Sequence, residues 1–113
     1  MAIVEILPSL IKEIEAHFKK QGVEILEYLK SLENSPHKGK VIGIVGGVII
    51  KELKYNNFRF YFIADAFKLK CFDAKELTDL LLTFVRMSGK KDQQKVIDEI
   101  RRVLVIIGPA GFE

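Results

Sequence analysis

The strongest constraint in the sequence is a predicted β-hairpin between Gly46 and Asp65, which reads GGVIIKELKYNNFRFYFIAD. Apolar and polar residues alternate on both sides of Asn56-Asn57, as they do in strands buried on one face. Asparagine tolerates the positive φ that two-residue hairpin turns require, so this dipeptide predicts the turn and therefore the register. The predicted cross-strand pairs are Tyr55 with Phe58, Lys54 with Arg59, Leu53 with Phe60, Glu52 with Tyr61 and Lys51 with Phe62.

This register divides the hairpin into an apolar face and a charged face. The apolar face carries Leu53, Tyr55, Phe58, Phe60 and Phe62, which we expect to be buried. The charged face carries Glu52, Lys54, Arg59 and Tyr61. A sheet that packs on the core with one face explains both sets.

The residues before the hairpin predict a short strand and two helices. Ala2 to Ile6 form the strand, and an amphipathic helix follows from Ser9 until Gly22 ends it. A second helix carries a leucine stripe and stops at Asn34, Ser35 and Pro36. We interpret Gly22 as the corner of a helical hairpin, and one long bent helix is the alternative.

The glycines of the apolar segment Val41 to Ile50 predict a bulge or a bend before the hairpin. After the hairpin, the alternation in Phe67 to Phe72 predicts a further strand. Asp73 and Glu76 have the spacing of a capping box, which predicts a short helical turn. Leu81 to Met87 suits a buried strand or a helix, and we favour the strand because the loop SGKKD follows it.

A clear amphipathic helix begins at Asp92, and Gly108-Pro109 should end it. We expect the GPAGFE tail to be frayed. The predicted element order is β-α-α-β-β-β-β-α. This order predicts an α+β fold in one domain, with the N-terminal helical hairpin and the C-terminal helix packed on a mainly antiparallel sheet.

Composition narrows the class of protein. The chain has 113 residues, enough for one domain, and 18 Lys and Arg against 15 Asp and Glu give a formal charge of +3. The one cysteine, Cys71, favours a reducing compartment. The N-terminus lacks the basic region of a signal peptide, and the apolar run Val41 to Ile50 is too short to span a bilayer. We therefore expect a cytoplasmic protein with no membrane partner.

No motif for a metal or a cofactor stands out. His17 and His37 lack partners at metal-ligand spacing, and surface histidines are usually solvated. The glycines at 43, 46 and 47 lie in a β-type segment without the residues of a phosphate loop. We expect no bound metal and no cofactor.

The charged face of the hairpin is the candidate functional surface. Like charges that lie opposite each other in a sheet destabilise it, so Lys54 and Arg59 need a compensating anion. Glu52, diagonal to Arg59, could be that anion, and the row would then be a surface with an internal ion pair and no function. The functional alternative is phosphate recognition, with Arg and Lys binding phosphate and Tyr61 stacking an RNA base. Such a set could also cleave RNA without a metal.

The order of four segments resembles that of the RelE/ParE superfamily of small toxins, including its HigB-like and phage-derived branches. The helical hairpin ends in EILEYLKSLENSPHKGK, two strands follow as KELK and FRFYFI, and the chain closes with FVRMSGKKDQQKVIDEIRRVL. The resemblance covers roughly Ile25 to Leu104. It implies helices packed on a curved, mainly antiparallel sheet.

The resemblance also implies a function: the toxin of a type II toxin-antitoxin system that cleaves mRNA on the ribosome without a metal. The resemblance implies Lys54, Arg59 and Arg86 as catalytic residues, and Lys90 and Lys91 match its double-lysine loop as RNA contacts. We add Tyr61 from the charged face to the predicted catalytic set and Lys51 to the predicted RNA contacts. The partners would be a cognate antitoxin, the ribosome and mRNA. Two alternatives stay open, a non-enzymatic protein of this type that binds RNA or a partner, and an inhibitor of gyrase.

Overall fold

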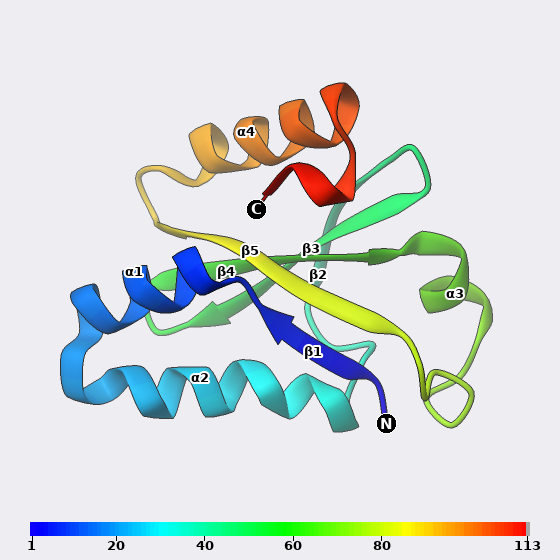
Figure 1. The fold of residues 1–113 in the computed structure, drawn as a ribbon, viewed down its shortest axis with the longest axis horizontal. Helices are drawn as coiled ribbons and strands as arrows, with labels where there is room; N and C mark the ends of the chain where they lie inside the picture. The colour runs from blue at the N-terminus through cyan, green and yellow to red at the C-terminus, as the bar shows by residue number, and fades with distance from the viewer. Residues whose placement is uncertain (113) are drawn as a thin grey trace.

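A five-stranded mixed sheet forms the centre of the computed structural model, which describes residues 1–112 (Figure 1). The strands are β1 (Ile3–Ile6), β2 (Lys40–Val45), β3 (Val48–Tyr55), β4 (Phe58–Asp65) and β5 (Leu81–Gly89). The helices are α1 (Pro8–Phe18), α2 (Gly22–Lys30), α3 (Ala66–Cys71) and α4 (Gln93–Ile106). Three 3-10 segments complete the list: η1 (Lys19–Gln21), η2 (Ser31–Asn34) and η3 (Pro109–Phe112).

The strand order is β1-β5-β4-β3-β2, with β1 parallel to β5 and the other pairs antiparallel. Helices α1 and α2 cover one face of the sheet, and α4 crosses the other (Figure 1). The predicted α+β class, with an N-terminal helical hairpin, a mainly antiparallel sheet and a C-terminal helix, is therefore confirmed.

The predicted register of the β3-β4 hairpin is confirmed at all five pairs. Asn56 has a φ of 53°, in the left-handed region that asparagine enters more readily than most residues. On the apolar face, Leu53, Phe60 and Phe62 are no more than 3% exposed. The turn and the alternation thus act together, because a shift by one residue would turn these side chains to the opposite face.

The segment Val41 to Ile50 contains both a bulge and a turn. The bulge lies between Val41 and Gly43 in the β2-β3 pairing. Gly46 and Gly47, with φ of 55° and 81°, then make the turn that separates β2 from β3. A left-handed backbone at two successive positions favours glycine, which is why the chain turns here.

The helical hairpin is confirmed, but its corner comes earlier than predicted. Helix α1 ends at Phe18, and Lys19 takes the corner with a φ of 52°. Gly22 is the first residue of α2, and its position is close to α1, since an added Cβ would lie 3.7 Å from the Cα of Glu15. A Cβ at this distance would make an ordinary contact, so the packing of the two helices does not require glycine here.

The predicted strand at Phe67 to Phe72 is wrong, because this segment forms α3. The carboxylate of Asp65 accepts a hydrogen bond from the backbone N–H of Lys68 at 2.9 Å and so caps the helix. The next prediction is partly right. Asp73 and Glu76 make the reciprocal bonds of a capping box, at 3.0 and 3.2 Å, but the chain there forms turns without a helix.

The last two elements agree with the sequence, whereas the tail does not. Leu81 to Met87 is part of β5, which lies inside the sheet between β1 and β4. Helix α4 buries Ile97, Ile100 and Leu104, as its amphipathic pattern predicts. The prediction of a frayed tail is wrong for residues up to Phe112, because Phe112 is buried, with 4% of its surface exposed. Among residues 1–112, no helix is long and apolar enough to cross a membrane.

Asn56→Val should lower the free energy of unfolding by about 1–2 kcal/mol, because a branched side chain is strained in the left-handed region. Asn56→Gly should leave it unchanged or raise it. Asn57→Val is the matched control in the same turn, where φ is not positive. Urea denaturation of the three variants measures these differences, and equal losses for the two valine variants would contradict the proposed turn geometry.

Candidate nucleic-acid interface

Three connections of the chain meet at one end of the sheet and carry exposed lysines. The β4-β5 register pairs Phe58 with Gly89, so the loop after β5 lies beside the β3-β4 turn. Phe18, at the end of α1, packs against Phe58 with ring centroids 4.8 Å apart, so the α1-α2 corner lies there too (Figure 1). We call this region the basic end; its exposed lysines are Lys19, Lys20, Lys54, Lys90 and Lys91.

Lys54 and Arg59 lie opposite each other, as predicted, but their environments differ. Lys54 is exposed. The side chain of Arg59 is 12% exposed, and its Nε lies 3.3 Å from Oε1 of Glu52. Its Nη1 also donates to the carbonyl of Asn57 at 3.3 Å. The internal ion pair that the sequence left open is therefore present.

Glu52 is the centre of a small polar network beneath the start of α4. Its Oε1 also accepts a hydrogen bond from Nε2 of Gln93 at 2.9 Å, and the residue is 8% exposed. Within residues 1–112, no buried side-chain nitrogen or oxygen lacks a hydrogen-bond partner. Because a buried carboxylate needs such partners, Glu52 ties the hairpin to α4.

Tyr61 is part of the same network and does not reach the surface. It is fully buried, and its hydroxyl lies 2.9 Å from Oγ of Ser88. Burial raises the pKa of the phenol; the Ser88 hydrogen bond opposes this shift, and the Glu52 carboxylate adds to it. The prediction that Tyr61 stacks an RNA base does not fit this position, because α4 covers the face that the hairpin alone would expose.

Arg86 holds the C-terminal elements against the sheet. Its Nε lies 2.9 Å from Oε1 of Glu99 on α4, and Nη1 donates to the carbonyl of Val85 at 2.7 Å. The guanidinium carbon lies 5.1 Å from the ring centroid of Phe112. The predicted catalytic role of Arg86 would require the guanidinium to leave these contacts, although its side chain is 25% exposed.

The predicted RNA contact of Lys51 does not fit its position in this structure. The residue is 4% exposed and lies on the core face, where it pairs with Phe62. Its Nζ donates to the carbonyl of His37 at 2.8 Å, and burial lowers its pKa. Lys51 therefore anchors the loop before β2. The exposed Lys90 and Lys91 remain where the sequence placed them, at the end of β5.

A cleft of about 420 Å³ adjoins the basic end, between α1 and α4. Its lining includes His17, Ser88 and Lys95. From the sequence, His17 is predicted to be a solvated residue without a partner. Its contact with Phe58, at a centroid distance of 4.9 Å, joins positions far apart in the chain, so no local pattern could have revealed it.

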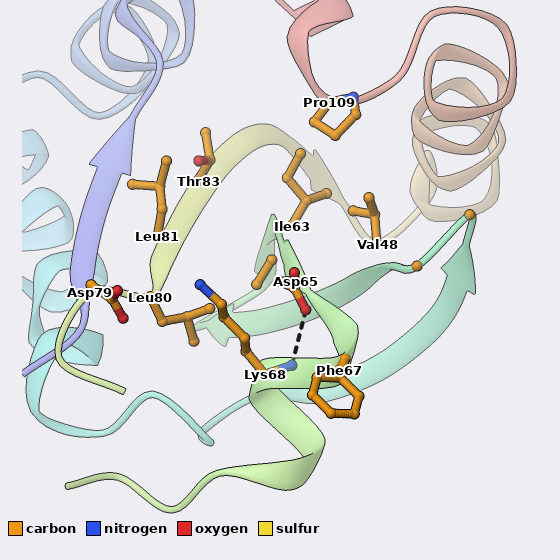
Figure 2. A pocket seen from close by; sticks show the side chains of 13 residues that line it. Val48, Ile63, Asp65, Phe67, Lys68, Asp79, Leu80, Leu81, Thr83 and Pro109 are labelled. Atoms are coloured by element: carbon orange, nitrogen blue, oxygen red, sulfur yellow. Dashed lines mark hydrogen bonds between the residues drawn. The ribbon is translucent and has the colours of Figure 1, made fainter. Parts of the chain in front are cut away.

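A second hollow, of about 600 Å³, lies at the other end of the sheet. Figure 2 shows Val48 and Ile63 on its floor, Lys68 extending into it from α3, and Pro109 and Phe67 on opposite sides. Asp65 and Asp79 also line it, so its charges are mixed. No three His, Cys, Asp or Glu side chains in the described chain are grouped to hold a metal ion.

Comparison of the chain with protein-family models, with curated proteins and with solved structures found no match.

Arg59→Ala should lower the free energy of unfolding by about 2 kcal/mol, because it leaves the Glu52 carboxylate buried without its cation. Lys54→Ala, at the opposite position in the register, should change it by no more than about 0.5 kcal/mol. Chemical denaturation at neutral pH measures both. Similar small effects of the two substitutions would mean that the Glu52 pair contributes little.

The free energy of unfolding should fall at alkaline pH because of Tyr61. Its pKa is raised in the folded state, so the neutral phenol stabilises the fold below a pH of about 10, and this contribution is lost as the pH rises through the raised pKa. Tyr61→Phe removes the hydrogen bond to Ser88 and should therefore lower the free energy of unfolding by about 1 kcal/mol at pH 8. The difference from wild type should be smaller at pH 11. A difference from wild type that stays constant from pH 8 to pH 11 would contradict this assignment.

Proposed function

We propose that this chain is a RelE-like protein that binds single-stranded RNA through its basic end. The observation that carries the proposal is the pairing of Phe58 with Gly89, which places Lys90 and Lys91 beside the turn that follows Lys54. Exposed ammonium groups on three neighbouring connections suit a flexible phosphate backbone, because each can contact a different phosphate. Such a protein would meet its RNA in the cytoplasm.

Binding is better supported than cleavage. Of the four predicted catalytic residues, Arg59 and Arg86 are held by Glu52 and Glu99. Tyr61 is buried against Ser88. A ribonuclease would need these groups to face the scissile phosphate. The toxin activity on ribosomes, with an antitoxin that neutralises it, therefore stands as the second candidate, carried by the sequence resemblance.

Replacement of Lys54, Lys90 and Lys91 together by alanine should weaken RNA binding. Three lost phosphate contacts should reduce the slope of log affinity against log salt concentration by about 2 for a single strand. Fluorescence anisotropy of a labelled RNA oligonucleotide, measured at several salt concentrations, gives this slope.

The matched control replaces Lys30, Lys70 and Lys75, which are exposed outside the basic end and carry the same total charge. This control variant should bind RNA nearly as tightly as wild type does. Equal losses of RNA affinity in both variants would mean that binding depends only on the net charge and not on the basic end. The same RNA is then placed on ribosomes and examined on a denaturing gel. If the wild-type protein cleaves this RNA on ribosomes and the basic-end variant does not, the protein is an endoribonuclease. The proposal of binding without cleavage is then wrong.

A further inference from the structure

The cleft between α1 and α4 has the size and position of a site for one base of a bound RNA strand. Its volume of about 420 Å³ lies within the range of small-ligand sites. Gly89 lines it and directly precedes Lys90, so the cleft opens beside the basic end. Its lining also includes Glu13, His17, Phe58, Asp92, Lys95 and Glu99.

Aromatic rings form one wall of this cleft. The exposed His17 ring stands edge-on to Phe58 and to Phe18, with centroids 4.9 and 4.8 Å away and interplanar angles of 70° and 68°. These contacts hold the imidazole in place while leaving it accessible. Single-stranded RNA is commonly bound by stacking of its bases on such rings.

The polar groups of the cleft favour a base that donates hydrogen bonds. Glu13 lies one helical turn before His17 on the same side of α1, and Asp92 adds a second carboxylate from the start of α4. Glu99 is already paired with Arg86. Carboxylates only accept hydrogen bonds, and guanine presents N1–H and the N2 amino group side by side, which one carboxylate can accept together. Uracil presents mainly carbonyl oxygens on the same edge.

We propose that this cleft binds a guanine base, stacked on His17 and bonded through its N1–H and N2 amino group to Glu13. The proposal rests on the proposed function, because Lys90 and Lys91 hold the phosphates next to that base. Lys95 lines the same cleft and supplies a cation for the guanine O6 or for the nearest phosphate.

Titration of the protein with GMP and with UMP tests the cleft alone, with the ring resonances of His17 followed by NMR and assigned with a His17→Gln variant. GMP should shift these resonances and saturate at a concentration at least about five-fold lower than UMP does. Glu13→Gln should abolish the difference between the nucleotides. Glu15→Gln, exposed on the same helix and outside the cleft, should preserve it.

Equal titration by the two nucleotides, or no shift of the His17 ring by GMP, overturns the guanine site. Binding of RNA oligonucleotides through the basic end is measured separately, and it can persist in that case. Conversely, a GMP-specific shift of His17 in a protein that does not bind oligonucleotides overturns the RNA-binding function and leaves the cleft as a site for a free guanine nucleotide.

Discussion

The polar contacts between the β3-β4 hairpin and α4 depend on one buried group, the carboxylate of Glu52. It forms an ion pair with Arg59 on β4 and accepts a hydrogen bond from Gln93 at the start of α4. A carboxylate that is only 8% exposed must keep such partners, because an unpaired charge out of water costs several kcal/mol. One charge therefore links the register of the hairpin to the place where α4 begins on the sheet.

This network divides the basic residues into two groups with different uses. Arg59 and Arg86 are paired with carboxylates and hold β4, β5 and α4 together. The exposed lysines of the basic end stay in water, where a compact, strongly hydrated ammonium is most stable. A surface that looks uniformly basic in the sequence thus consists of structural arginines below and accessible lysines at one end. The proposed RNA contacts follow from the second group alone.

Much of the fold could be predicted because its signals are local. The turn at Asn56, the alternation on both sides of it and the amphipathic pattern of α4 each depend on neighbouring residues. Phe67 to Phe72 was predicted wrongly because six alternating residues also fit a short helix, and the cap from Asp65 decides for the helix. The packed position of Phe112 could not be predicted, because its partner Arg86 lies on β5, far away in the chain.

The sequence by itself determined where most strands and helices lie and how the two strands of the hairpin pair, because backbone preference and hydrophobic periodicity act over a few residues. Only the tertiary structure decided which face of the sheet α4 covers. That choice buries Tyr61, brings Gln93 to the Glu52 carboxylate and sets α4 against α1 to form the cleft beside His17. The physical reason is that packing joins residues distant in sequence: the side chains that meet are set by strand order and helix placement, and no local pattern carries that information.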